Sequence, residues 1–306
     1  DDRFSVGPGT AEPYGCPDRS HHRTQGYGAE MAGSSIGGRA TKPHSATQPE
    51  ELLAGAATGV GSLPHRSTDA AARFALHHYD VPAIPTLPRG NPAESMIAQA
   101  VLGIDGVTAG QYGGVAIDVA RLDPEAPVTT NLNGAEYATL RRFLDVAVEL
   151  RWTGPVKWQF VGPVTLGVAL TRAGLDVATA FAVATKAVHA HLEAIHAAVM
   201  AVLPQSPQIA VLDEPMFSGL LGDGFPIAPE PAIDLLSTAM ATLSDRVPVG
   251  VHCCGELDVA SLVAAGSDLL SFPVSSHLLD SAGYLGRFLD DGGIIAWGVV
   301  ATDGPV

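Results

Sequence analysis

In the sequence His252-Cys253-Cys254, one residue separates the metal-binding side chains of His252 and Cys254. An apolar run that predicts a β-strand precedes them. Alternate residues of a strand project to the same side, so His252 and Cys254 could bind one ion while Cys253 points into packing contacts. Mixed nitrogen and sulfur ligands are typical of zinc, which needs a third protein ligand; the candidates are Glu256, Asp213 and Cys253. Buried cysteines also act as small apolar residues, so spacing alone leaves zinc binding and plain packing equally open.

Other reactive side chains stand at the ends of predicted strands. Ser62 ends the first strand, Thr165 follows a later one, and Asp213 and Glu214 end the strand after that. In a parallel barrel the carboxyl ends of all strands lie on one rim, where the active sites of that fold are found. Polar residues on a rim can also simply face solvent, but the chemical types gathered here favour a site.

The elements that must position these residues alternate along the chain. Apolar runs predict strands or extended segments at 57–63, 81–87, 115–119, 156–161, 208–212, 247–252, 269–272 and 294–299. Helical spacing predicts helices at 69–78 (with Thr68 as N-cap), 92–102, 136–150, 177–203, 231–243, 259–265 and near 281–289. This alternation predicts an α/β fold with a parallel sheet covered on both faces.

The number of units favours a (β/α)8 TIM barrel over a doubly wound sheet. The sequence has neither a G-x-G-x-x-G fingerprint opening a helix after the first strand nor a phosphate-binding P-loop, which weakens the nucleotide-binding versions of the open sheet. An eighth strand is not evident before Val306. We therefore expect a single barrel domain at 51–306 that lacks its last unit at the C-terminus.

Residues 1–50 differ from the rest of the chain. They hold eight Gly and five Pro but only Phe4, Val6 and Ile36 among Leu, Ile, Val and Phe. Such a segment cannot bury enough apolar surface to offset its ordering entropy. We interpret it as a polar, disordered tail.

Charge and cysteine content restrict the partners and the compartment. The chain of 306 residues has 17 Lys and Arg against 32 Asp and Glu, a formal charge of −15. This balance, without a basic cluster, argues against nucleic acid or an anionic membrane as a partner. Three cysteines, two of them adjacent, exclude a disulfide framework and favour a reducing compartment. With no signal peptide and no uncharged apolar span, we expect a cytoplasmic protein.

A second set of possible ligands lies on the long helix at 177–203. His189, Glu193 and His196 share one face at positions i, i+4 and i+7. The set does not form H-E-x-x-H and lies in the middle of a helix rather than at the rim. We interpret it as a solvated or partly buried helix face.

Four short motifs occur together and in the order found in one family. They are TGVGSLP at 58–64, GPVT at 162–165, LDEP at 212–215 and VHCC at 251–254. Together they resemble the catalytic domain of cobalamin-independent methionine synthase. More widely, they resemble the superfamily that this domain shares with uroporphyrinogen decarboxylase and the methylcobamide:coenzyme M methyltransferases. The resemblance covers nearly all of the chain outside the tail and implies a (β/α)8 barrel whose zinc binds the acceptor thiol.

The resemblance also implies roles for individual residues. His252 and Cys254 would be zinc ligands. Asp213 would hold the amino group of homocysteine, and Gly61 and Ser62 would hold its carboxylate. Zinc would convert the thiol to a thiolate, which is the nucleophile that accepts the methyl group. The remaining candidates for substrate binding are Glu94, Thr165 and Glu214.

The sequence departs from the family pattern at several positions. Ser271-Phe272-Pro273 stands where methionine synthase has a Glu ligand, and the Trp that stacks on folate is replaced within Gly167-Val168-Ala169. Asp303 stands near the late His that serves as proton donor, and it could donate a proton only with a pKa well above about 3.9. The family's last Cys ligand would lie beyond Val306. Gly255 brings the motif closer to the coenzyme M branch, which tolerates the missing Glu.

Three functions follow as alternatives. The first is a zinc-dependent S-methyltransferase that moves a methyl group from a methylated folate or a methylcorrinoid protein to a thiol, most simply homocysteine. The second is a decarboxylase of the uroporphyrinogen type, which needs an arginine-rich cleft where this rim offers mainly Arg66 and Arg89. The third is a catalytically inactive barrel that acts as a binding module, as the residues Pro273 and Asp303 would suggest.

Overall fold

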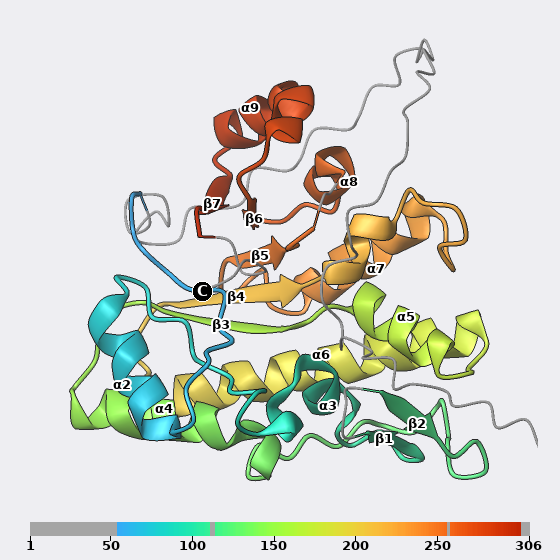
Figure 1. Cartoon of the computed structure of the whole chain (residues 1–306), viewed down its shortest axis with the longest axis horizontal. Coiled ribbons are helices and arrows are strands. Elements are labelled where there is room, and N and C mark those ends of the chain that lie inside the picture. Colours follow the sequence, from blue (N-terminus) through green and yellow to red (C-terminus); the bar gives the residue numbers. More distant parts are fainter. Residues whose placement is uncertain (1–53, 111–113, 256–257, 301–306) are drawn as a thin grey trace, which may run out of the picture.

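The core of the fold is a five-stranded parallel sheet. A computed structural model describes residues 54–110, 114–255 and 258–300 of the chain. The strands are hydrogen-bonded in chain order, as Figure 1 shows: β3 (Val156–Val161), β4 (Gln208–Asp213), β5 (Val249–His252), β6 (Leu269–Pro273) and β7 (Ile294–Gly298). The prediction of an α/β fold with a parallel sheet is confirmed. Among the described residues, no strand closes the sheet from β7 back to its other edge.

Two extended segments continue this sheet beyond β3. Ala83 forms a parallel bridge with Lys157 of β3, and Thr86 forms one with Ser62. Backbone hydrogen bonds accompany the bridges, from Ile84 N to Lys157 O at 2.7 Å and from Leu63 N to Thr86 O at 2.9 Å. The predicted first strand and the Pro-rich segment after it therefore run parallel to β3, which places Ser62 on the same edge as the carboxyl ends of the other strands.

Helices alternate with these strands. The α-helices are α2 (Thr68–His78), α3 (Met96–Val101), α4 (Ala138–Glu149), α5 (Pro163–Arg172), α6 (Val177–Val202), α7 (Pro229–Ala241), α8 (Val259–Ala264) and α9 (Ala282–Asp290). Short 3-10 helices are η1 (Pro92–Glu94), η2 (Ala135–Tyr137), η3 (Pro215–Gly219) and η4 (Ser276–Ser281). In the described part of the chain, no helix has both the length and the apolar character needed to cross a bilayer.

The two faces of the sheet differ in what covers them. We call the face that bears Trp158 and Phe160 of β3 the outer face and the opposite one the inner face. On the outer face, the indole of Trp158 donates to Gln208 Oε1 at 2.9 Å, and Phe160 stacks on His191 of α6 with ring centroids 4.9 Å apart. The inner face carries a much smaller buried cluster of Val81, Ile209, Val211 and Leu269. Strand side chains alternate between the two faces of a sheet. Asp213, two positions after Val211, and Ser271, two positions after Leu269, therefore also lie on the inner face.

The histidines of α6 belong to the outer packing. His196 is buried and its Nδ1 lies 3.2 Å from Gln208 Oε1, while Glu193 pairs with Arg246. No group of three or more metal-binding side chains is found among the described residues, those of α6 included. His196 thus contributes to the buried packing of α6 and Glu193 to an ion pair on its surface.

Several elements differ from their prediction. The strand predicted at 115–119 is β2 (Val115–Ile117), which pairs antiparallel with β1 (Val107–Ala109) and lies outside the parallel sheet. The N-cap of α2 is Ser67, whose Oγ accepts from Ala70 N at 3.2 Å, and not Thr68. The helix predicted at 92–102 is interrupted at Ser95, which caps α3. The α5 helix was not predicted at all.

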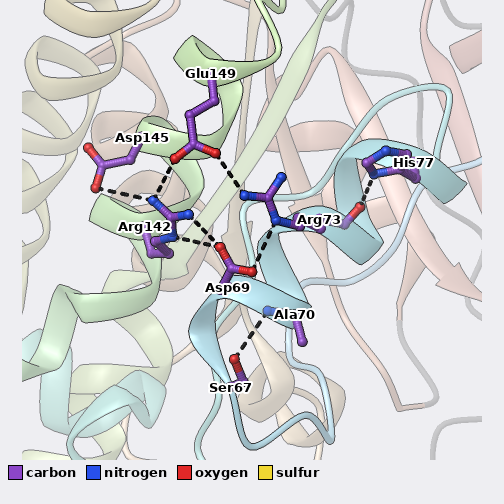
Figure 2. Close-up of polar contacts among 8 residues, drawn as sticks. All are labelled: Ser67, Asp69, Ala70, Arg73, His77, Arg142, Asp145 and Glu149. Atoms are coloured by element: carbon purple, nitrogen blue, oxygen red, sulfur yellow. Dashed lines mark hydrogen bonds and ion pairs between the residues drawn. The ribbon is translucent and has the colours of Figure 1, made fainter.

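Charged side chains join α2 to α4 on the surface. Arg73 and Arg142 both bond to Asp69 and to Glu149, with Arg73 Nη2 2.7 Å and Arg142 Nη1 3.0 Å from the carboxylate oxygens of Glu149 (Figure 2). The four residues form a closed ring of alternating charge. Networks of this kind contribute more than isolated surface pairs, so the ring fixes α2 against α4 beside the first extended segment.

Candidate active site at the carboxyl ends of the strands

A row of polar residues crosses the inner face at the carboxyl end of the sheet. Asp213 of β4 is in register with His252 of β5, and His252 is in register with Ser271 of β6. Neighbouring strands lie about 4.8 Å apart, so the three residues are direct neighbours. His252 Nδ1 lies 3.0 Å from Ser271 Oγ. The rim expected from the sequence is therefore present for these strands.

The three residues of His252-Cys253-Cys254 differ in burial. Cys253 is fully buried in the outer core, whereas His252 and Cys254 are half-buried. His252 is the last residue of β5 and lies on the inner face in register with Asp213 and Ser271, and Cys254 follows two residues after the strand. Glu256, a candidate third ligand, lies outside the described residues, as does Asp303, the expected proton donor.

The environment of His252 keeps its imidazole neutral. Burial, together with the positive charge of Lys157, lowers its pKa to about 4 from the ordinary value near 6.5. Neutral imidazole is the form that binds metals. Since Nδ1 faces the Ser271 hydroxyl, Nε2 is the nitrogen left for a ligand bond.

In the zinc-free protein, we expect His252 to stay neutral down to about pH 4. The unfolded chain takes up this proton near pH 6.5, so between these values the unfolded state binds more protons and the folded state loses stability as the pH falls. NMR titration of the imidazole carbons, with the His252→Gln variant to assign the signal, measures the midpoint. A midpoint near 6.5 in the folded protein contradicts this expectation.

Asp213 is the second titratable group of the row. Its Oδ1 is buried and has no hydrogen-bond partner among the described residues. Burial raises the pKa of Asp213 to about 7, while the charge of Lys157 opposes the rise. A buried acceptor without a donor is costly for a protein, so this oxygen is suited to a cationic or hydrogen-bond donating ligand.

Lys157 and Gln159 lie on the same inner face, and the sequence prediction did not include them. Lys157 is 6% exposed, and its Nζ donates to Val60 O at 2.6 Å, Gly59 O at 3.2 Å and Gln159 Oε1 at 3.3 Å. Gln159 Nε2 in turn donates to Ile84 O at 3.0 Å. One signal was available: Lys157 is a charged residue inside the apolar run 156–161. Its backbone partners, the carbonyls of Gly59 and Val60, lie almost a hundred residues earlier in the chain, and the sequence around them carries no signal of this contact.

Gly61 and Ser62 lie above these two side chains. Gly61 is buried with φ +140°, and a Cβ on it would lie 1.9 Å from Gln159 Nε2, so only glycine fits. Ser62 is exposed, and its Oγ lies 3.3 Å from Thr86 Oγ1. The Ser62 hydroxyl is therefore accessible at the carboxyl end of the sheet, as a carboxylate-binding role requires.

Thr165 and Glu214 are hydrogen-bonded to each other. Thr165 lies in the first turn of α5, not in a loop as predicted, and both residues are 0% exposed. Glu214 accepts from Val164 N at 2.9 Å, Thr165 N at 2.7 Å and Thr165 Oγ1 at 2.6 Å. Burial raises the pKa of Glu214 to about 7, and these donors oppose the rise. Glu214 thus satisfies backbone N–H groups in the first turn of α5. The substrate contacts expected for Thr165 and Glu214 are therefore not part of the function proposed below.

Glu94 is held in the same way at another helix. It is 1% exposed and accepts from Leu87 N at 2.7 Å, from Thr139 N at 2.9 Å and from Thr139 Oγ1 at 2.8 Å. Thr139 is the second residue of α4, so Glu94 caps that helix and ties it to the segment at Leu87. The expected substrate contact of Glu94 is replaced by a structural role, because its oxygens are already satisfied inside the protein.

Comparison with known proteins adds no family assignment. No protein-family model matches the chain, and no curated protein matches it.

Proposed function

We propose that the chain is a zinc-dependent methyltransferase built on a (β/α)8 barrel. It would transfer a methyl group from a methylated folate or a methylcorrinoid protein to a thiol, homocysteine in the simplest case, to give methionine. The observation that carries the proposal is His252 on the inner face at the carboxyl end of a parallel sheet, with the half-buried Cys254 two residues after it. Active sites of parallel barrels lie at that end.

The donor chemistry of this pair fits zinc. A neutral imidazole oriented by Ser271 and a thiol two residues later match the nitrogen and sulfur ligands that zinc prefers. The described residues supply these two donors and no group of three. Catalytic zinc sites keep a position open for substrate, so the acceptor thiol would occupy one position and residues outside the described ranges, such as Glu256, would supply another.

The chain's own residues would then bind and orient an amino acid thiol. Asp213 offers a buried oxygen, without a hydrogen-bond partner in the described part of the chain, for the ammonium group. The Gly61–Ser62 turn, with its exposed hydroxyl, faces the carboxylate. Zinc, when bound, lowers the pKa of a coordinated thiol so that thiolate is present near neutral pH. Asp303 is the proposed proton donor to the leaving group.

Metal analysis tests this proposal directly. Protein purified without chelator is expected to contain an equimolar amount of zinc, and Cys254→Ser is expected to lose it. Cys253→Ala is the matched control, since Cys253 faces the outer core and its loss removes no ligand. Wild-type protein without zinc, or Cys254→Ser protein that retains it, contradicts the proposal.

One observation favours a second candidate, a barrel that binds a ligand without catalysis. No group of three or more potential metal ligands is found among the described residues. The two candidates are separated by an assay with methylated tetrahydrofolate and with methylcobalamin as donors. Zinc-loaded protein that binds homocysteine but forms no methionine from either donor supports the binding module.

A further inference from the structure

The ammonium of Lys157 lies in an unusual position for a charge. It is on the inner face of β3, where the neighbours across the sheet are the apolar Ile209 and Ala83. Lysine is almost never this deeply buried unless its charge is compensated. All three ammonium protons have acceptors: the carbonyls of Gly59 and Val60 and the amide oxygen of Gln159.

These acceptors make Lys157 part of the framework rather than a ligand group. An ammonium has three donors and no acceptor, so no donor is left over for a substrate. Burial lowers the pKa of Lys157 to about 8, and the carboxylate of Asp213 supports the charged form. The charge therefore serves to hold the two carbonyls of the first extended segment.

The two carbonyls that Lys157 binds lie directly before the proposed carboxylate-binding turn, Gly61–Ser62. Gly59 and Val60 precede Gly61 and Ser62, and Gln159 lies directly against Gly61. On the far side, Thr86 N donates to Gly61 O at 3.2 Å. The Gly61–Ser62 turn is thus held by backbone hydrogen bonds to the segment at Thr86 and by the side chains of Lys157 and Gln159 of β3. We call these two side chains the Lys157–Gln159 brace.

We propose that the Lys157–Gln159 brace positions the Gly61–Ser62 turn for the carboxylate of the amino acid substrate, across the sheet from Asp213. The inference rests on the proposed function and assigns two positioning residues to it. The brace touches no substrate itself. It fixes the distance between the carboxylate contact and the ammonium contact, and thereby selects α-amino acid thiols over thiols that lack the carboxylate.

The test compares two thiols that differ only in that group. Calorimetric titration of zinc-loaded protein measures the Kd of homocysteine and of 3-aminopropanethiol, which has no carboxylate. Lys157→Met is expected to weaken homocysteine binding about tenfold or more, since small displacements of a binding group have effects of that size. Lys157→Met also removes the positive charge that opposes the rise in the pKa of Asp213, so the Kd of 3-aminopropanethiol is expected to rise as well, but less than that of homocysteine. In Gln159→Met, which keeps this charge, the Kd of 3-aminopropanethiol is expected to change by less than about twofold. General damage to the fold would weaken both thiols alike.

Lys186→Met is the matched control. Lys186 also donates to a backbone carbonyl, Pro124 O at 2.7 Å, but it lies on α6 away from the rim. Its substitution is expected to leave both Kd values unchanged. Gln159→Met provides a second variant that keeps the ammonium and its two carbonyl bonds, and it carries the test if Lys157→Met does not fold.

The outcomes separate the inference from the function on which it rests. Wild-type protein that binds neither thiol contradicts the proposed function and the role of the brace with it. Wild-type protein that binds both thiols equally contradicts the carboxylate contact, and with it the role of the brace, but leaves zinc-dependent transfer to a thiol standing. A wild-type preference for homocysteine that survives in Lys157→Met and Gln159→Met contradicts the brace alone. Equal weakening of both thiols in Gln159→Met, which keeps the charge beside Asp213, also contradicts it, because the brace would then be purely structural.

Discussion

Glu214→Ala is expected to destabilise the protein by about 3 to 5 kcal/mol. The substitution leaves three buried donors at the start of α5 without an acceptor, namely Val164 N, Thr165 N and Thr165 Oγ1. Each unsatisfied buried donor costs about 1 to 3 kcal/mol, and water cannot reach a site that is 0% exposed without further rearrangement. Domains of ordinary stability have about 5 to 15 kcal/mol in total, so the effect is large.

Urea denaturation followed by circular dichroism measures this loss. Glu230→Ala is the matched control: Glu230 also lies in the first turn of a helix, α7, but it is exposed. Its substitution is expected to cost no more than about 0.5 kcal/mol, as for other surface positions. A similar small loss in Glu214→Ala would show that the three donors find other partners and that the capping role is wrong.

Gly61→Ala is expected to have the second large effect, at about 2 to 4 kcal/mol. The new Cβ would overlap Gln159 Nε2 and Cδ, at 1.9 and 2.2 Å. Gln159 cannot simply move aside, because it is bonded to Ile84 O and to Lys157. Overpacking of this kind costs about 1 to 3 kcal/mol, and an unfavourable backbone conformation adds about 1 kcal/mol or more.

Gly174→Ala separates the two contributions in the same denaturation measurement. Gly174 has φ +108°, but a Cβ there meets no atom within 4 Å. Its substitution is expected to cost about 1 kcal/mol from backbone strain alone. If Gly61→Ala costs no more than this control, then Gln159 does not confine the turn, and the contact between them is not tight.

The sequence predicted the parallel sheet well because its strands carry a strong local signal. Each of β3 to β7 is a nearly continuous apolar run, and such runs separated by helices are typical of a buried parallel sheet. The strand at Val115–Ile117 has the same local pattern, yet it pairs with its neighbour β1 in a separate hairpin-like sheet. Periodicity identifies a strand but does not name its partner.

The helix α5 was missed for a related reason. Residues 163–170 are all buried, so this helix has no polar face and no helical period in its sequence. An apolar run of that length is ambiguous between strand and helix when periodicity is the only guide. Thr165 was consequently expected in a loop at the rim, although it lies in the first turn of a buried helix.

The site was predictable only where its chemistry lies within one segment. Strand alternation predicts that Cys253 is buried while His252 and Cys254 are less so, and the structure shows this difference in burial. The roles of Glu94 and Glu214 depend on Thr139 and Thr165, which are 45 and 49 residues away in the chain. A carboxylate at the end of a strand has the same sequence signal whether it faces a ligand or a helix.

These two distant caps bear on the order in which the chain folds. The first turn of α5 is complete only when Glu214, which follows β4, has arrived, and the first turn of α4 needs Glu94 from an earlier segment. Neither helix can therefore mature as an isolated unit, because each is closed by a residue of another strand–helix unit. We expect amide exchange at Thr139 and Thr165 to slow only when the neighbouring unit has docked, so that the domain folds as overlapping, cooperative pairs of units.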